Sequence, residues 1–322
     1  MQRRSMMAGM AATLVLGSAA TRAIAQPQPV RIVVGFPPGG GFDTVARQLA
    51  TPFQTLIDRP VVVENRTGAA GRIALDYLKH APKNGEVIAV AHQGVLTLSP
   101  YVYKNVPFDP VKDFTPITRL VTFDYCLAVG TAVPATNLTD YLKWLRDNPT
   151  KAAHGSSGNG TTPHLLGVWF HQKIGVPAIH VPYRGTPPIV IDLVGGRLPS
   201  SVNTVGDLLE QHRAGKVRIL ATMGATRNAQ TPDIPTLKES GIDIVVPGWV
   251  GLYGPGAMDP RVVQSYNEMA VKALATPALR DSMAGLGWSV SPTTSADMGK
   301  IQRDELAAWA PIVKASGIQP EE

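Results

Sequence analysis

The stretch RIVVGFPPGGGFDTVARQL, residues 31–49, decides the fold class of this chain. Residues 32–34 form an apolar run that predicts a strand, and the glycine-rich turn 37–41 follows it. Asp43 then stands where an N-cap is expected, ahead of an amphipathic helix over residues 43–57. A strand, a turn of bare backbone and a helix N-terminus present free N–H groups and the positive end of a helix dipole. This junction therefore predicts an anion-binding site.

Strands and helices alternate on either side of this stretch. In the first block, strands are expected at residues 30–34, 61–64 and 87–91, with helices at 43–57 and 73–80 between them. This βαβαβ pattern predicts a parallel sheet with right-handed crossovers. Extended segments at residues 114–119 and 123–129 follow.

A second alternating block predicts a second lobe. Its expected helices are 138–147, 163–174, 189–194 and 206–214, and Thr136 or Asn137 is the expected cap of the first one. Its expected strands are 151–154, 178–181, 198–203 and 217–222. Three further helices, at 260–275, 277–285 and 295–316, return to the first block. Extended crossings near 119–129 and 244–254 join the blocks. We therefore expect an α/β fold of two lobes, residues 26–123 with 248–322 and residues 124–247, with the site in the cleft between them.

The N-terminus predicts an export signal. Arg3 and Arg4 form a basic region, residues 6–20 are apolar, and the A-x-A motif at 23–25 predicts cleavage after Ala25. The apolar stretch is too short for a membrane anchor, and the residue directly after the cleavage point is not a cysteine that could carry a lipid. A periplasmic protein beginning at Gln26 is expected, exported by the Sec or the twin-arginine route.

Composition and charge exclude several classes of protein. Loss of residues 1–25 removes three arginines and lowers the formal net charge from +6 to +3. The chain has no basic run with interleaved aromatic residues, so a nucleic-acid partner is not expected. Cys126, the only cysteine, lies in an apolar segment and is expected to be a buried hydrophobic residue rather than a nucleophile.

Two more glycine-rich turns precede predicted helices. Residues 67–71 read TGAAG, and residues 155–162 read GSSGNGTT ahead of Pro163, which suits a first helical turn. A carboxylate needs several convergent donors to leave water, and backbone N–H groups supply them without a loss of side-chain entropy. Three such turns in one chain favour a receptor for a small acid.

Enzyme motifs are incomplete in this sequence. The first turn lacks the GK[ST] ending of a P-loop, and the dinucleotide pattern breaks at Thr44. His164 and His171 are seven residues apart, which is not the spacing of a zinc pair, so neither a metal nor a cofactor is expected. A hydrolase using Ser156 or Ser157 remains an alternative, but it lacks the final glycine of a nucleophile elbow and an evident base.

Several segments together resemble a known family. They are IVVGFPPGG at 32–40 with Asp43, VVVENR at 61–66 with Gly68 and Gly71, SSG at 156–158 with His164, VPYRG at 181–185, GKVR at 215–218, and DIPT at 233–236. Over nearly all of the mature chain, this combination resembles the solute receptors of tripartite tricarboxylate transporters, the Bug-type periplasmic receptors.

The resemblance implies a two-domain Venus-flytrap receptor that captures a carboxylate and delivers it to integral membrane transporter subunits. It implies a monomer without catalysis; a signalling partner that reads the same closed shape is an alternative. Ligand-binding residues carried over by the resemblance are Phe36, Pro38, Gly39, Gly40, Asp43, Ala69 and Ala70 in the first lobe, and Ser156, Ser157, Gly158, Thr161, His164, Arg184 and Asn203 in the second. Asp43 is expected to act as a cap and water anchor. Arg184 either pairs with a carboxylate or braces the cleft.

The chain departs from the family pattern at two places. Asn203 stands where such receptors often have aspartate, which argues against an amino-acid ligand. His92 and Gln93 stand where small hydroxyl residues are expected, so His92 either donates to a second carboxylate, stacks on a ring, or is a solvated loop residue. Citrate-like, aromatic and nicotinate-like acids all fit, with a slight preference for an aromatic or hydroxylated carboxylate.

Overall fold

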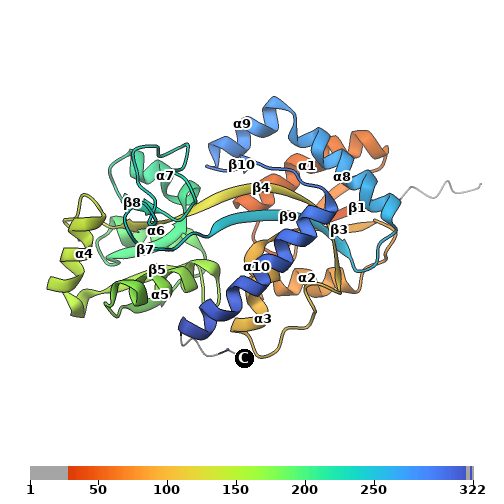
Figure 1. The fold of residues 1–322 in the computed structure, drawn as a ribbon. Helices are drawn as coiled ribbons and strands as arrows, with labels where there is room; N and C mark the ends of the chain where they lie inside the picture. Colours follow the sequence, from red (N-terminus) through yellow and green to blue (C-terminus); the bar gives the residue numbers. More distant parts are fainter. Residues whose placement is uncertain (1–27, 317–319, 321–322) are drawn as a thin grey trace, which may run out of the picture.

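The computed structural model describes residues 28–316 and residue 320, so the expected signal peptide lies outside the described residues. Two α/β lobes lie side by side and share a ten-stranded sheet (Figure 1). The strand order is β2-β1-β3-β9-β4-β7-β5-β6, and β8 and β10 also pair with β4. None of the helices among these residues is both long enough and apolar enough to cross a membrane.

The first lobe is built on three parallel strands. They are β1 (Val30–Val34), β2 (Val61–Asn65) and β3 (Val87–His92), connected by α1 (Gly41–Ile57) and α2 (Arg72–Lys79). Helix α1 buries Val45, Ala46, Leu49 and Phe53, the helical spacing that the sequence shows. The predicted βαβαβ unit is confirmed.

The second lobe repeats this arrangement. Its parallel strands are β5 (Ala153–Ser156), β6 (Ile179–Pro182) and β7 (Ser200–Thr204), and β8 (Arg218–Thr222) pairs with β4. Its helices are α4 (Leu138–Asp147), α5 (Thr162–Ile174), α6 (Thr186–Val194) and α7 (Val205–Arg213). The Asn137 side chain caps α4 by accepting the Asp140 N–H at 2.9 Å, which confirms one of the two predicted caps.

Two long antiparallel strands pass between the lobes (Figure 1). Strand β4 (Phe114–Val129) pairs with β9 (Pro247–Pro255) over its first part and with β7 and β8 over its last residues. The two extended segments expected at 114–119 and 123–129 are therefore one continuous strand. The domain limits drawn from the sequence stay a prediction.

The C-terminal helices return to the first lobe. They are α8 (Pro260–Leu274), α9 (Pro277–Gly285) and α10 (Ser295–Ser316), with the short strand β10 (Ser289–Val290) between α9 and α10. Helix α10 contacts β4 and also reaches α5 of the second lobe, so it spans the junction between the lobes (Figure 1).

Some element boundaries differ from the prediction. Helix α1 begins at Gly41 with Gly40 as its N-cap, so Asp43 lies in the first turn and is not the cap; its side chain reaches back to the N–H of Gly39 instead. Helix α6 begins earlier than expected, since Pro187 and Pro188 fit its first turn. Residues 149–151 form a 3₁₀ turn, so β5 starts at Ala153 rather than at Lys151.

The sequence did not indicate the segment after β3. A π-helical turn over Gly94–Leu98 leads into the short helix α3 (Ser99–Val102), and all five residues of the turn are buried. Cys126 is fully buried, as expected, and burial raises the pKa of its thiol.

Candidate ligand-binding site

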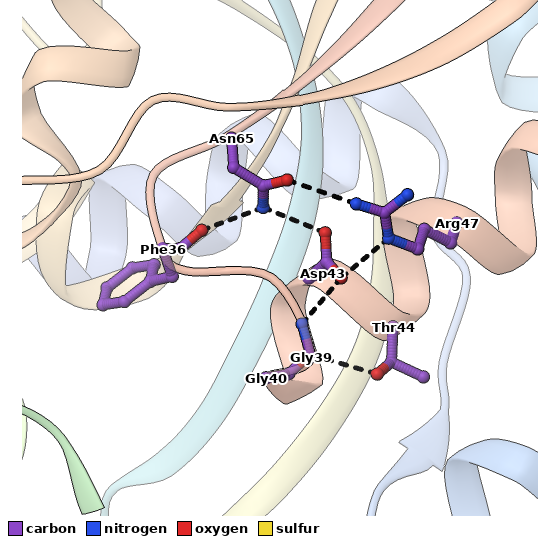
Figure 2. A network of polar contacts seen from close by, with 7 residues as sticks. All are labelled: Phe36, Gly39, Gly40, Asp43, Thr44, Arg47 and Asn65. Atoms are coloured by element: carbon purple, nitrogen blue, oxygen red, sulfur yellow. Dashed lines mark hydrogen bonds and ion pairs between the residues drawn. The ribbon is translucent and has the colours of Figure 1, made fainter.

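Asp43 holds the first glycine-rich loop against strand β2 (Figure 2). Its Oδ2 accepts the Gly39 N–H at 2.9 Å and the Arg47 Nε–H at 2.8 Å, and its Oδ1 accepts from the Asn65 side-chain amide at 2.9 Å. The same amide donates to the Phe36 carbonyl at 2.9 Å. One buried carboxylate thus fixes the path of the loop from the end of β1 into α1.

The environment of Asp43 keeps it ionised. Burial alone raises the pKa of this carboxyl, but hydrogen bonds from Arg47, Gly39 and Asn65 outweigh it and hold the pKa below the ordinary value. Since the Gly39 N–H serves Asp43 and Pro38 has no N–H, the remaining loop donors belong to Gly40 and the first turn of α1.

The second loop has an unusual backbone. Gly68, Ala69, Ala70 and Gly71 all have positive φ, of 121°, 47°, 52° and 92°. Two successive alanines in the left-handed region are strained, and such strain is maintained by packing, often at functional sites. The packing here is tight, because a Cβ on Gly35 would lie 2.6 Å from the Gly71 Cα. The first and second loops therefore touch backbone to backbone.

His92 lies at the end of β3, between the loops. Its ring stacks on Phe42, with centroids 5.3 Å apart, and meets Phe36 edge-on at 5.1 Å. Its Nδ1 accepts the Gly94 N–H at 3.1 Å, which places the proton on Nε2. Burial lowers the pKa of His92 to about 4, against a smaller opposing effect of the nearby Ala70 backbone. His92 is thus a neutral N–H donor; its buried Nε2 faces the Ala70 backbone but makes no hydrogen bond of standard geometry with the described residues.

Gln93, next in the chain, is fully buried. Its Oε1 accepts the Trp249 N–H at 2.8 Å, which ties the end of β3 to β9. Its Nε2 is buried without a hydrogen-bond partner in the described part of the chain. His92 and Gln93, which were both predicted from the sequence, therefore each have one N–H donor group that makes no hydrogen bond of standard geometry with the described residues.

The third loop, at the start of the second lobe, is held by its own polar groups. The Ser156 hydroxyl donates to the Gly158 carbonyl at 3.0 Å, and the Thr161 hydroxyl donates to the same carbonyl at 2.7 Å. The His164 Nδ1 accepts the Gly160 N–H at 3.1 Å. These bonds close the loop in front of α5, where Pro163 occupies the first turn as expected.

Four histidines pack together behind this loop. The His164 and His180 rings stack with centroids 3.7 Å apart, and His154 lies 5.1 Å from His180 and 5.3 Å from His171. Burial lowers their pKa values to about 4 for His164 and His171, about 3 for His180 and about 2 for His154; neighbouring imidazoles add to the shifts of His154 and His180. The cluster is neutral. Within the described residues, no set of three or more His, Cys, Asp or Glu side chains is arranged to hold a metal ion.

Ser156 has a neighbouring base that the sequence did not reveal, the His180 Nε2 at 2.7 Å. The expectation that this serine lacks a base is therefore wrong, but the pair is poorly suited to catalysis. Ser156 is fully buried, and its one hydroxyl hydrogen can serve either the Gly158 carbonyl or the His180 ring but not both. A pKa of about 3 also makes His180 a weak base.

The second-lobe residues Asn203 and Arg184 lie in different settings. Asn203 is buried, and its amide donates to the Ser201 hydroxyl at 2.9 Å. Arg184 is exposed in the turn after β6, and Ser157 is half-buried beside Ser156.

The lobes meet at the three loops. A Cβ on Gly94 would lie 2.7 Å from the Thr162 hydroxyl and 3.0 Å from the His92 ring, so the N-terminus of α5 rests against the end of β3. The Tyr103 hydroxyl, from the first lobe, donates to the Asn159 carbonyl of the third loop at 3.0 Å. Thr162 is the last residue of the third glycine-rich turn but was not among the predicted binding residues. Tyr103 was missed at the sequence level, because no local pattern marks it.

A second contact between the lobes lies on α7. A Cβ on Gly206 would lie 1.7 Å from the Leu286 carbonyl oxygen, and a Cβ on Gly287 would lie 3.0 Å from the Gly206 Cα. The turn after α9 therefore approaches the start of α7 backbone to backbone. The two lobes therefore touch here as well as at the three loops.

Comparison with known proteins agrees with this arrangement. The family model described as "Tripartite tricarboxylate transporter family receptor" matches residues 45–318. The chain belongs to this receptor family. The two-lobed architecture is accordingly the periplasmic binding protein fold of such receptors.

Individual relatives of this receptor match over most of their length. A Cupriavidus necator protein named for its place in the gbd 5' region is 37% identical over 294 residues, which are 88% of each chain. The solved structure of the periplasmic binding protein BugD is similar with a TM-score of 0.82 and 29% identity, covering 91% of this chain and 99% of that one. The structure of Rpa4515 from R. palustris with adipate gives a TM-score of 0.85 and 28% identity, covering 92% and 99%.

Proposed function

We propose that this receptor closes its two lobes around a small carboxylate and presents it to a membrane transporter. The observation that carries the proposal is the meeting of three glycine-rich loops at His92, a buried neutral donor that makes no hydrogen bond of standard geometry with the described residues. Backbone N–H groups at helix starts and neutral N–H donors stabilise a carboxylate that has left water. The similar receptor solved with adipate supports the same class of ligand.

The proposed ligand-binding residues are the sequence-predicted set. In the first lobe, Gly40 supplies backbone N–H, His92 and Gln93 supply side-chain donors, and Phe36 packs on the His92 ring. Asp43 shapes the loop instead of contacting an anion, because its charge would repel one. In the second lobe, the loop from Ser156 to Thr161 closes over the ligand. We further propose a periplasmic monomer without catalysis, exported with cleavage after Ala25.

A thermal-shift screen of the protein beginning at Gln26 tests the proposal. Aliphatic, aromatic and nicotinate-like carboxylates are compared with uncharged amides of the same shape. A carboxylate at a hundred times its Kd stabilises the folded state by ~2.7 kcal/mol, which raises Tm by several degrees. Shifts for amides and carboxylates alike, or for neither, contradict the proposal.

A variant of the first loop makes the test site-specific. Gly40 has φ of −79°, and a Cβ there meets only the Pro37 carbonyl oxygen, at 3.7 Å, so Gly40→Val is expected to fold normally. It is also expected to abolish binding, because the side chain blocks approach to the loop backbone. Gly285→Ala, where an added Cβ meets no atom within 4 Å, is the matched control. Unchanged affinity in Gly40→Val would remove this loop from the site.

The partner of the closed receptor is tested separately. The transporter and the signalling alternatives both depend on the closed shape, so ligand binding does not distinguish them. We propose the transporter, and uptake of the identified acid into cells expressing the receptor with its permease tests it. Uptake that is the same with and without the receptor contradicts this partner.

A further inference from the structure

Arg72 opens helix α2, directly after the left-handed turn of the second loop. The central carbon of its guanidinium lies 3.3 Å from the centroid of the Tyr103 ring. Its Nη1 is buried and has no hydrogen-bond partner among the described residues. This side chain belongs to no part of the loop scaffolds described above.

Tyr103 places Arg72 at the boundary between the lobes. The Tyr103 ring is buried, and its hydroxyl donates to the Asn159 carbonyl of the third loop. A Cβ on Gly160 would lie 2.4 Å from that hydroxyl, so the ring packs tightly against the third loop. The guanidinium stacked on this ring is therefore positioned where the second loop of one lobe faces the third loop of the other.

The charge of Arg72 is unmatched there. Residues 28–316 supply no carboxylate within ion-pair distance of it. A guanidinium has five N–H donors and stays charged, and a cation at the N-terminus of a helix is disfavoured by the helix dipole. The Tyr103 ring stabilises the cation in part, and an anion that joins it would use the N–H donors that the described residues leave unpaired.

Arg66 shows what the protein does with the same stack elsewhere. Its guanidinium carbon lies 3.5 Å from the centroid of the Tyr77 ring, a geometry close to that of Arg72 on Tyr103. Arg66, however, forms an ion pair with Glu64 at 2.6 Å. Stacking on tyrosine thus occurs in both places, and of the two arginines only Arg72 lacks a counter-ion among the described residues.

We infer that Arg72 pairs with a second anionic group of the ligand and that the receptor selects dicarboxylates over monocarboxylates. The inference rests on the proposed function and adds a specificity-determining residue to it. One carboxylate binds the loop N–H groups near His92, and the other forms a planar, two-point contact with the guanidinium held on Tyr103. A monocarboxylate of equal length leaves the cation unpaired when the lobes close.

Isothermal titration calorimetry with matched acids tests this assignment. Succinate, glutarate and adipate are each compared with the monocarboxylate of the same chain length, in the wild type, Arg72→Gln and Arg66→Gln. We expect the best dicarboxylate to bind the wild type at least tenfold more tightly than its monocarboxylate. Arg72→Gln is expected to lose at least tenfold for the dicarboxylate and less than twofold for the monocarboxylate. Arg66→Gln is expected to change neither.

The outcomes separate the inference from the proposed function. If the wild type binds both kinds of acid equally, or Arg72→Gln weakens both equally or neither, the inference is wrong while the carboxylate receptor stands. If the wild type binds no carboxylate, both fail. Should Arg72→Gln not fold, Arg72→Lys decides, because an ammonium keeps the charge and loses the planar contact. A severalfold loss confined to the dicarboxylate then supports the inference, and an unchanged preference overturns it.

Discussion

The first and third glycine-rich loops are both fixed by side-chain hydrogen bonds, but the first depends on a charged group and the third on uncharged groups. The first loop is held by an ionised carboxylate, Asp43, whose pKa is lowered by its hydrogen bonds. The third is held by Ser156 and His164 in front of neutral imidazoles whose pKa values are lowered by burial. A glycine-rich loop can thus be fixed by a charge or by uncharged donors and acceptors. The difference is expected to appear when the pH falls.

The two anchors respond to acid at different pH. Asp43 contributes stability that is present above its unfolded pKa, about 3.9, and is lost as the pH falls through its lower folded value. The buried histidines begin to lose stability near pH 6.5, because the unfolded chain binds protons there and the folded chain does not. We therefore expect a fall in pH to destabilise the protein through the second-lobe histidines before it acts through Asp43.

The largest expected effect is acid destabilisation through the four histidines. Each is expected to remove on the order of 1 kcal/mol of unfolding free energy between pH 6.5 and 5.5, about 4 kcal/mol together. Urea denaturation at pH 7.5, 6.5 and 5.5 measures the loss. His80→Gln, which removes an exposed histidine, is the control and is expected to leave the slope unchanged. If the free energy of unfolding does not change over this pH range, the folded cluster binds protons as readily as the unfolded chain does, which contradicts the prediction.

The second largest loss of stability is expected when Asp43, the charged side chain that fixes the first loop, is replaced. Asp43→Asn is expected to lower the free energy of unfolding by about 2 kcal/mol at pH 7, since hydrogen bonds to a charged group are lost in a buried place. The gap to the wild type is expected to narrow as the pH falls below the ordinary aspartate pKa and through the lower folded value, where Asp43 itself becomes protonated. Asp147→Asn removes an exposed carboxylate from a similar pair with Lys143 and is the matched control. Equal effects of the two variants would contradict the anchoring role.

The uncharged anchor is tested at Ser156. Ser156→Ala removes the hydroxyl between the Gly158 carbonyl and His180; the carbonyl keeps its bond from Thr161, and the His180 Nε2 loses the Ser156 hydroxyl. A loss of about 1 to 2 kcal/mol is expected, without the narrowing at low pH that Asp43→Asn shows. Ser157→Ala, at the neighbouring position, is expected to stay within about 0.5 kcal/mol of the wild type. Thermal and urea unfolding of both variants measure the difference.

The smallest effect is expected at Arg47. Its side chain is half exposed, at 52%, so solvent screens its ion pair with Asp43. Arg47→Gln is expected to lower the unfolding free energy by less than either Asp43→Asn or Ser156→Ala and to raise the pKa of Asp43. Denaturation at low and high salt measures the first, and NMR titration of Asp43 the second. A loss as large as that of Asp43→Asn would assign the anchoring to the arginine.

Much of the fold could be predicted from local pattern. Apolar runs and the turns after them correctly predicted β1, β3 and α1. Strands and helices have different hydrophobic periods, so the sequence shows where one element ends and the next begins. Helix starts were less accurate. The sequence predicts Asp43 as the cap, but its side chain bonds back to the Gly39 N–H instead, and the residue type alone does not specify which of the two arrangements forms.

The site was predictable where it is built from contiguous turns. The three loops carry their own signals in glycine and serine, whereas the residues that bring them together come from distant segments. Tyr103 reaches the third loop from a helix that the sequence did not indicate, and His180 reaches Ser156 from the next strand. Contacts of this kind depend on sheet order, which periodicity along the chain does not contain.

The close approach of Gly206 to the Leu286 carbonyl has a consequence for affinity. In the lobe closure that we propose, this contact is the same whichever acid lies between the lobes, and it uses backbone atoms far along the chain from the three loops. We therefore expect its contribution to binding to be common to every ligand and to affect the overall scale of Kd, whereas the loops and Arg72 are expected to affect the ratios between ligands. Scale and selectivity can be tuned independently in such a receptor.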